Sequence, residues 1–338
     1  MKIIECVPNF SEGRNEDTFE EIKQALEGVK NCKLLSLEPD SDYNRVVVTL
    51  AGNEKGILNG AVAISLAAAR NIDMRNHKGE HPRLGAIDVV PFVPVKNVTM
   101  EECVKISESF AEIISERLNI PVYLYEAAAR RKERKNLSDI RKGEYEALEE
   151  KLKDPNWHPD YGTNKFDPKL GAIVTGARFF LIAYNVNIKS RDVKYAKEIG
   201  EVLRESGHSK RDDNGKVIKI NGEVVKVPGR LKSVKAMGVA LEKFHFTQVS
   251  MNLTNYNITP LHVAFEEVKK EANRLEVEVE GSEIVGLVPL EALIHSGKYY
   301  ADGRSMDEKS LVDLAIEKLG LSSINYFIKN EKIIDYMI

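Results

Sequence analysis

A short segment, NHKGEHPRLG at residues 76–85, concentrates side chains that can do chemistry. His77, Glu80 and His81 match the H-x-x-E-H pattern of zinc hydrolases, whose ligands share one face of a helix. A glycine lies inside this span, and the proline after His81 biases that residue away from the helical region. The two imidazoles then need not converge, so the sequence disfavours a metal site.

The second interpretation of this segment is an acid–base histidine beside an anion site. An imidazole titrates near neutral pH and can take a proton and return it within one turnover. Lys78 or Arg83 can hold a carboxylate, and Glu80 or Asp88 can orient the ring. A polar surface loop is the plainest interpretation. From the residues alone, the segment favours group transfer or hydrolysis on an anionic substrate.

Composition narrows the class of protein. The chain has 338 residues, enough for two domains, with 43% hydrophobic and 30% charged residues. Its formal charge of -3 provides no field that attracts nucleic acid or an anionic membrane. No apolar run reaches about eighteen residues, and the N-terminus lacks a signal-peptide core. The three cysteines form no C-x-x-C pair, so we expect small buried thiols in a cytoplasmic protein.

Hydrophobic periodicity predicts the elements that must position the histidine segment. We expect strands at 2–7, 32–38, 45–52, 86–95 and 121–126, and helices from about 17, over 54–72 and over 99–118. Asn15 is a candidate N-cap for the first helix. Pro91 and Pro94 place the fourth strand at the edge of a sheet or at a bulge.

Two further segments follow these elements. The highly charged stretch 127–154 is expected to be helical. Residues 157–171, which contain two prolines and two glycines, are expected to form a long ordered loop.

The second half of the chain repeats the order of the first. Strands are expected at 178–188, 233–240, 246–253 and 284–288, with helices capped by Ser190, over about 260–274 and over 307–319. The shared strand–helix–strand–strand–helix–strand order suggests two split βαβ, ferredoxin-like halves. Two Asn-Gly pairs among alternating apolar residues predict a β-hairpin insertion at about 212–228. We therefore divide the chain into residues 1–177 and 178–338.

Several long motifs together resemble the glutamate formiminotransferase family. They are ECVPNFSEGRN, HKGEHPRLGAIDVVPFVPV, PVYLYEAAAR, IRKGEYEAL, TGARFFLIAYNVN and VGLVPLEAL, and the resemblance runs from Glu5 to about Tyr336. Some members carry a cyclodeaminase domain after the transferase, and this chain resembles the stand-alone form. The resemblance implies an α/β (α+β) fold of two similar ferredoxin-like βαββαβ subdomains, with a substrate cleft or tunnel between them, in a homodimer.

The resemblance also implies a cytoplasmic folate enzyme of one-carbon and histidine metabolism. Such an enzyme moves the formimino group of N-formimino-L-glutamate to N5 of tetrahydrofolate, giving 5-formimino-tetrahydrofolate and L-glutamate. Tetrahydrofolate is then a co-substrate, and no metal, nucleic acid or membrane is expected. Formyl transfer, with N-formylglutamate or 5-formyl-tetrahydrofolate, is the alternative within the family. A zinc hydrolase built on the H-x-x-E-H match is the remaining alternative.

The family's functional residues can be carried onto this sequence where its motifs match. The catalytic histidine lies within GEHPR and is His81 here. The folate-binding stretch matches GTNKFDPKLG, which comprises Gly162, Thr163, Asn164, Lys165, Phe166, Asp167, Pro168, Lys169, Leu170 and Gly171. An ordinary linker is the other interpretation of this stretch. Four basic residues are candidates for binding carboxylates, with a surface salt bridge as the alternative for each: Arg45, Lys78, Arg83 and Arg178.

Overall fold

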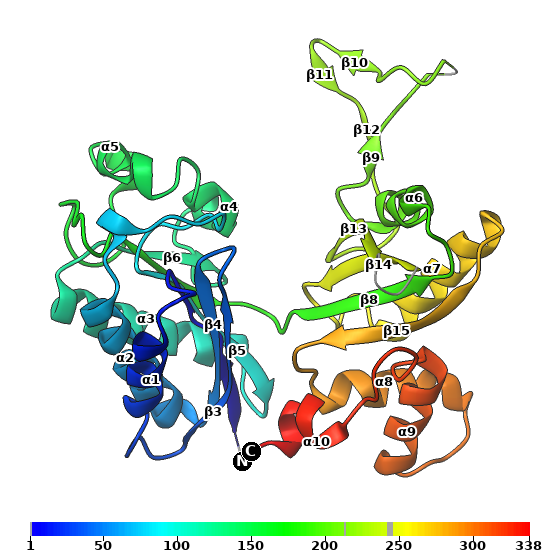
Figure 1. The fold of residues 1–338 in the computed structure, drawn as a ribbon, viewed down its shortest axis with the longest axis horizontal. Helices are drawn as coiled ribbons and strands as arrows, with labels where there is room; N and C mark the ends of the chain where they lie inside the picture. The colour runs from blue at the N-terminus through cyan, green and yellow to red at the C-terminus, as the bar shows by residue number, and fades with distance from the viewer. Residues whose placement is uncertain (1, 213, 242–245) are drawn as a thin grey trace. The chain divides into compact units, whose positions relative to one another are not determined.

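Two compact units make up the protein. The computed structural model describes residues 2–212, 214–241 and 246–338. The chain divides into unit 1, which holds Met1–Phe179, and unit 2, which holds Phe180–Met337 (Figure 1). Each unit has a mixed α/β fold built on its own sheet. Among the described residues, no helix combines the length and the apolar character needed to cross a membrane.

Unit 1 is a sheet with three long helices. Its main elements are β1 (Ile3–Cys6), β2 (Asn9–Phe10), α1 (Glu16–Gln24), β3 (Cys32–Asp40), β4 (Arg45–Gly52), α2 (Glu54–Asn71), β5 (Ile87–Lys96), α3 (Met100–Leu118), β6 (Val122–Glu126) and β7 (Ile173–Ala177). The strand order is β3, β4, β1/β2, β5, β7, β6, because β1 and β2 both pair with β4 and β5. The helices predicted from about residue 17, over 54–72 and over 99–118 are confirmed as α1, α2 and α3, and the Asn15 side chain caps α1 by accepting from the backbone amides of Asp17 and Thr18.

The position of β5 corrects one prediction. This strand lies inside the sheet, between β1/β2 and the parallel strand β7, so the edge placement inferred from Pro91 and Pro94 is wrong. The bulge alternative is confirmed. The register with β1 shifts beside Pro94, and the register with β2 shifts so that Asp88 is an extra residue on β5. At each bulge, one residue of β5 has no partner in the hydrogen-bonded ladder, so residues that cannot pair regularly are tolerated inside the sheet.

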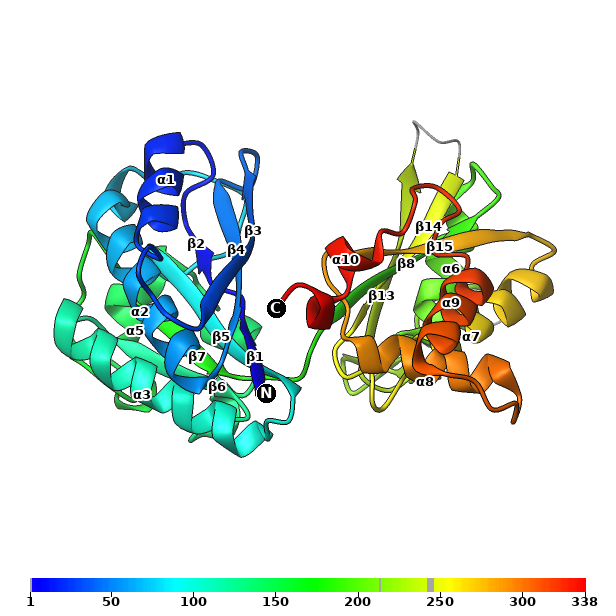
Figure 2. The same ribbon diagram turned by 90° about the horizontal axis from the view of Figure 1, so that it is seen from below.

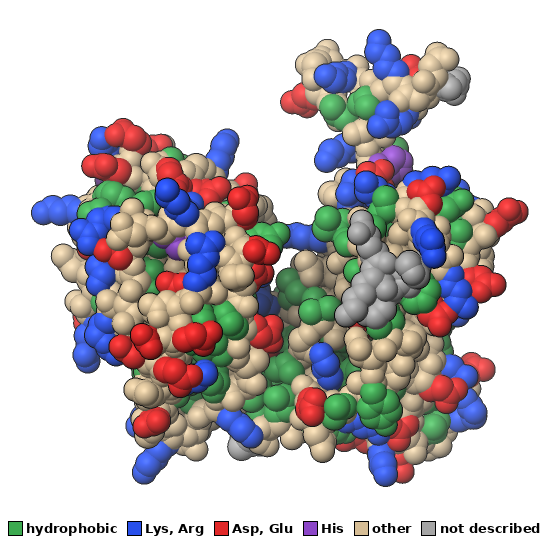
Figure 3. Space-filling view, in the orientation of Figure 1, with side chains coloured by type: hydrophobic (Ala, Val, Ile, Leu, Met, Phe, Trp, Pro, Cys, Tyr) green, Lys and Arg blue, Asp and Glu red, His purple; other side chains and the backbone are tan. Residues whose placement is uncertain are grey.

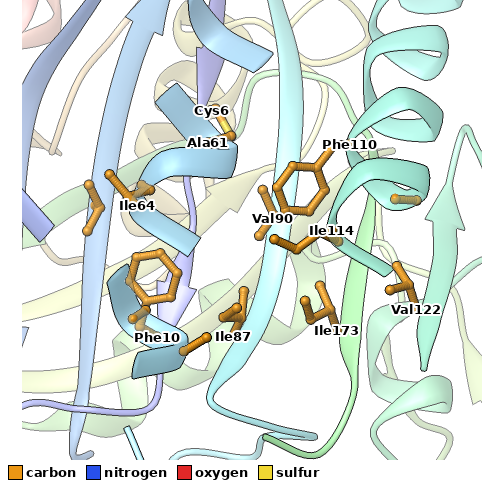
Figure 4. Close-up of a cluster of buried hydrophobic side chains, with 14 of the residues drawn as sticks. Cys6, Phe10, Ala61, Ile64, Ile87, Val90, Phe110, Ile114, Val122 and Ile173 are labelled. Carbon is orange, nitrogen blue, oxygen red and sulfur yellow. The ribbon is translucent and has the colours of Figure 1, made fainter. Parts of the chain in front are cut away.

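Hydrophobic clusters cover the two faces of this sheet. On one face, side chains of the helices, among them Ile64 of α2 and Phe110 of α3, pack with strand residues such as Phe10 and Val90 (Figure 4). On the other face a second cluster is built around the buried rings of Tyr123 and Tyr125 on β6. Both tyrosines are therefore part of the core of unit 1.

The charged segment after β6 is not one helix as predicted. It breaks into short turns: η2 (Lys132–Arg134), α4 (Leu137–Ile140), η3 (Tyr145–Ala147) and α5 (Leu148–Lys151). Gly143 and Glu144 both have positive φ angles, 85° and 56°, which end the helical path. Ile140, Leu148 and Leu152 instead join the second cluster, so the segment covers part of the sheet.

Unit 2 repeats the strand order of the first half of unit 1. Its main elements are β8 (Ile182–Ile188), α6 (Val193–Leu203), β13 (Val234–Leu241), β14 (Phe246–Leu253), α7 (Leu261–Arg274), β15 (Val279–Val285), α8 (Leu290–Ala301), α9 (Glu308–Leu319) and α10 (Lys329–Lys332). The antiparallel strands follow the order β13, β14, β8, β15, and α6 and α7 pack on one face (Figure 2). Asp192, rather than the predicted Ser190, caps α6.

A hairpin arm is inserted between α6 and β13. We call residues 208–227 the arm; they form β9 (His208–Ser209), β10 (Lys219–Ile220), β11 (Glu223–Val224) and β12 (Lys226–Val227). Asn221 and Gly222 turn the hairpin with φ angles of 52° and 85°, as a type I′ turn requires. Apart from residue 213, which lies outside the described residues, the predicted hairpin is confirmed. Its strands expose Ile220 and Val224. Figure 3 shows hydrophobic side chains among charged ones on the arm.

Candidate active site

The histidine segment is a loop, and its first histidine is held by the protein on both sides. After η1 (Met74–Asn76) no helix follows, so the two histidines do not share a helical face. The His77 Nε2 atom lies 2.9 Å from the Asn44 carbonyl oxygen, and Nδ1 accepts a hydrogen bond of 3.3 Å from Arg83 Nε. Burial lowers the pKa of His77, which favours the neutral ring with its proton on Nε2.

These contacts differ from the zinc-ligand arrangement that the H-x-x-E-H match raised. Both nitrogens of His77 are engaged within the protein, and the Glu80 side chain is exposed. Across the described parts of the chain, no group of three His, Cys, Asp or Glu side chains is arranged to hold a metal ion.

His81 lies beside a buried carboxylate. Its Nε2 atom is 3.5 Å from Asp88 Oδ2, a distance suited to an ion pair once the imidazole is protonated rather than to a hydrogen bond. The His81 side chain is 12% exposed and that of Asp88 only 1%. The Tyr43 ring stands edge-on to the imidazole, with centroids 6.4 Å apart. Nε2 therefore faces the protein, and Nδ1 is the ring nitrogen left for a substrate.

Asp88 is fixed by contacts that the sequence did not indicate. Its Oδ1 atom accepts from the Leu84 backbone amide at 3.0 Å and from Arg141 Nε at 3.3 Å, and the Arg141 guanidinium also pairs with Oδ2. The bulge at Asp88 gives this residue its place beside His81. Arg141 comes from the irregular segment 53 residues later, so no local pattern could have identified it.

Arg83 is committed to internal carboxylates. Its guanidinium donates to Glu144 at 2.9 Å and to Glu146 at 2.6 and 3.0 Å, in addition to its contact with His77. The side chain is only 7% exposed. This geometry favours a role in fixing the loop over the substrate contact expected from the sequence.

The structure brings the 162–171 stretch against the histidine loop. Ala86 N donates to Leu170 O at 2.9 Å, and Ala172 N donates to Leu84 O at 3.1 Å. Gly85 and Gly171 form a bridge with no room for side chains, since a Cβ on either would lie 2.2 Å from a carbonyl oxygen of the other segment. The stretch is therefore an ordered neighbour of His81.

Within this stretch, some side chains contact other groups of the described chain, whereas Lys165 does not. The Phe166 ring lies 5.4 Å from that of Tyr145, and the Asp167 carboxylate caps the Lys169 and Leu170 amides at 2.8 Å. Lys169 Nζ donates to the Arg70 carbonyl at 3.0 Å. Lys165 is exposed, and its ammonium forms no ion pair with another described residue. It is therefore available to bind a ligand.

Replacing Gly171 with alanine is expected to separate these segments. The new Cβ would meet Leu84 O at 2.2 Å, and the φ angle of +67° adds strain. Gly28 is the matched control, because its φ is +81° but nothing lies within 4 Å of a Cβ there. Urea unfolding should show a loss of about 1 kcal/mol for G28A and a loss of at least roughly 2–3 kcal/mol for G171A. Equal losses would contradict the close packing of the two loops.

The other basic candidates occupy different surroundings. Arg45 Nη1 donates to Asn9 Oδ1 at 3.3 Å, its guanidinium lies 5.7 Å from the Tyr43 ring, and its Nε is buried without a partner in the described chain. Lys78 is exposed on the loop, one residue beyond His77. Arg178 follows β7 and donates to the Phe179 carbonyl at 3.0 Å.

Arg178 also acts on Glu5, a buried carboxyl that gives a pH prediction. Burial raises the pKa of Glu5 to about 7, against the opposing pull of Arg178. Because the folded state holds this proton more tightly, the free energy of unfolding falls as pH rises from about 4.5 to 7. In E5Q this loss should be absent, so its stability relative to wild type should rise by on the order of 3 kcal/mol from pH 4.5 to pH 8. Urea titrations at the two pH values measure it, and parallel changes in both proteins would contradict the burial.

Taken together, the fold and this loop define a two-unit α/β protein in which a carboxylate-backed histidine adjoins a glycine-flanked loop. The chain belongs to the formiminotransferase family. The model of the formiminotransferase domain, N-terminal subdomain, matches residues 3–178, and the model of the formiminotransferase domain matches residues 183–338.

Relatives of two lengths are similar to the chain. The formimidoyltransferase-cyclodeaminase of Dictyostelium discoideum is 48% identical over 340 residues, which cover 100% of this chain and 60% of the relative. The glutamate formimidoyltransferase of Streptococcus pyogenes serotype M1 is 42% identical, covering 90% of this chain and 95% of the relative. That of Thermoplasma acidophilum is 41% identical, covering 94% and 98%. The chain thus spans about 60% of the bifunctional relatives and nearly the whole of the shorter ones.

Proposed function

We propose that this protein transfers the formimino group of N-formimino-L-glutamate to N5 of tetrahydrofolate, as a glutamate formimidoyltransferase. The observation that carries the proposal is the pairing of His81 with Asp88, which leaves one ring nitrogen for a substrate. Membership of the formiminotransferase family and similarity to two stand-alone glutamate formimidoyltransferases over more than 90% of their length support it.

The proposed mechanism moves one proton through His81. N5 attacks the amidine carbon, a carbon–nitrogen bond forms, and the nitrogen loses its proton to His81 Nδ1. The imidazolium is then stabilised by the Asp88 carboxylate 3.5 Å from Nε2. The same proton passes to the glutamate nitrogen, whose bond to the carbon breaks, and L-glutamate leaves. Neither a covalent enzyme intermediate nor a metal is needed.

For the folate we propose the 162–171 stretch, supported by its packing against the His81 loop. Phe166 offers a ring, and the exposed Lys165 suits the negative glutamate tail. For the donor's carboxylates we propose Arg45, Lys78 and Arg178. Arg83 is assigned to the loop instead, because Glu144 and Glu146 neutralise it.

We further propose that both halves are ferredoxin-like subdomains, 1–177 and 178–338. Support comes from the shared order of a βαββαβ unit: β5, β1/β2, β4, β3 in unit 1 and β15, β8, β14, β13 in unit 2. A cytoplasmic homodimer is proposed from the family resemblance. The free cysteines Cys6, Cys32 and Cys103 agree with a reducing compartment, and burial raises the pKa of the Cys103 thiol to about 12.

Purified protein offered each donor with tetrahydrofolate tests the proposal. Formation of 5-formimino-tetrahydrofolate from N-formimino-L-glutamate, with N-formylglutamate turning over more slowly, is expected. Preference for the formyl donor would establish the formyltransferase alternative. Absence of transfer from either donor would overturn the proposed function.

A further inference from the structure

The Asp88 carboxylate of unit 1 lies between two partners, Arg141 and His81. The Arg141 guanidinium binds both of its oxygens, with Nε 3.3 Å from Oδ1 and Nη2 on Oδ2. The oxygen nearest to His81 is that same Oδ2, 3.5 Å from the imidazole Nε2. Nε2 itself is buried without a hydrogen-bond partner in the described chain. The carboxylate is therefore bound first by the guanidinium and only more loosely by the imidazole.

This arrangement affects the charge beside His81 as well as the position of Asp88. A buried carboxylate with no other counter-charge would strongly favour the protonated imidazole, and an imidazole held in that state cannot accept a proton from a substrate. Arg141 is always cationic, and its side chain is only 15% exposed, so water screens its charge weakly. It therefore offsets much of the charge that Asp88 presents to the imidazole.

Other charged or titratable groups also surround His81. The neighbouring loops contribute His77, Lys78, Glu80, Arg83, Glu144 and Glu146. Lys78 and Glu80 are exposed, so solvent screens them, and Arg83 is neutralised by its two glutamates. Tyr43 presents the edge of its ring. Among the described residues, Asp88 and Arg141 are the buried charged pair beside the imidazole.

We propose that Arg141 is a positioning residue for acid–base catalysis, which holds Asp88 in place and shares its charge so that His81 can both accept and return a proton. The inference rests on the proposed function, because it deepens the role given there to His81. It has a directional consequence. Loss of Asp88 removes the charge that stabilises the imidazolium, whereas loss of Arg141 leaves that charge uncompensated.

Arg141→Gln and Asp88→Asn test the proposal through the pH dependence of kcat/KM, whose acid limb reports the essential base of the free enzyme. R141Q should move this limb up by about 1 pH unit, so that kcat/KM falls about tenfold below the limb and recovers at higher pH. D88N should move the limb to lower pH. Lys142→Gln removes an exposed charge next to Arg141, and as the matched control it should leave the limb unchanged.

Arg141→Lys keeps the charge but loses the bidentate contact, and it serves as the test where the unpaired buried carboxylate prevents R141Q from folding. Its acid limb should stay close to that of wild type. If Arg141 only orients the carboxylate, R141Q and R141K should both resemble D88N, because Asp88 would move away from the ring. That result, or an unchanged limb in folded R141Q, would overturn the inference.

NMR titration of the His81 imidazole, identified by its absence from H81A, follows the same charge without turnover. Opposite displacements of the titration midpoint in R141Q and D88N would support the inference even in a protein that transfers no formimino group, where only the proposed function is rejected. An unmoved midpoint in R141Q, together with transfer by wild type, would overturn the inference and leave the proposed function in place.

Discussion

Changing His81 to alanine should lower kcat for formimino transfer by about 10²–10⁴-fold, the usual contribution of a general acid–base residue. The alanine variant keeps Asp88, whose carboxylate remains bound by Arg141 and the Leu84 amide, so the loop should stay folded. Folate binding should be retained, because the 162–171 stretch is held by backbone hydrogen bonds that do not involve the imidazole. Steady-state kinetics and folate titration of the same preparation measure both effects.

Glu80→Ala provides the matched control in the same loop. Glu80 is exposed next to His81, and we expect E80A to retain wild-type turnover. A zinc hydrolase that used Glu80 as its general base would instead lose activity in E80A and would contain stoichiometric zinc. Near-wild-type turnover in H81A would remove the acid–base role assigned here.

The second large effect concerns stability: Asp160→Ala should reduce the free energy of unfolding by about 3–5 kcal/mol. Asp160 Oδ2 accepts from Arg134 Nη1 at 3.0 Å and from the Leu124 amide at 2.8 Å. Arg134 is 1% exposed, so loss of the carboxylate leaves a buried guanidinium without its counter-charge. The remaining contacts of Arg134, to the Asn156 and His158 carbonyls, cannot neutralise it.

The protein's single tryptophan reports this change directly. Trp157 lies 5.9 Å from the Arg134 guanidinium, so its fluorescence during urea unfolding follows the affected region. Glu150→Ala removes an exposed ion pair with Lys153 in the same segment and should cost no more than about 0.5 kcal/mol. A loss in D160A as small as that in E150A would mean that the pair contributes nothing.

Local sequence patterns correctly predicted the elements that are determined by residues adjacent in the chain. Helices α1, α2 and α3, the Asn15 cap and the arm's Asn-Gly turn follow from periodicity and turn chemistry. β7 was not predicted, because it is short, contains glycine and alanine, and is stabilised by parallel neighbours distant in sequence. The predicted strand at 178–188 begins at Ile182 instead.

In the site, too, local sequence identified some features, whereas others depend on residues distant in the chain. His81 stands out from its motif, but its surroundings depend on residues brought from elsewhere in the chain. Arg83 looked free to bind an anion because its partners, Glu144 and Glu146, lie about sixty residues away. Asp88 was one of two candidates to orient the ring, and only the β5 bulge and Arg141 distinguish it from Glu80. The roles of these residues in catalysis remain predictions for the kinetic experiments.

The arm of unit 2 has a practical consequence. Between Leu203 and Leu231 no described residue contributes a buried hydrophobic side chain, and each arm strand is two residues long. Its loop tip is therefore a suitable place to splice in an affinity tag or a fluorescent label, or to shorten the chain for crystallisation, without disturbing the folded body of the unit.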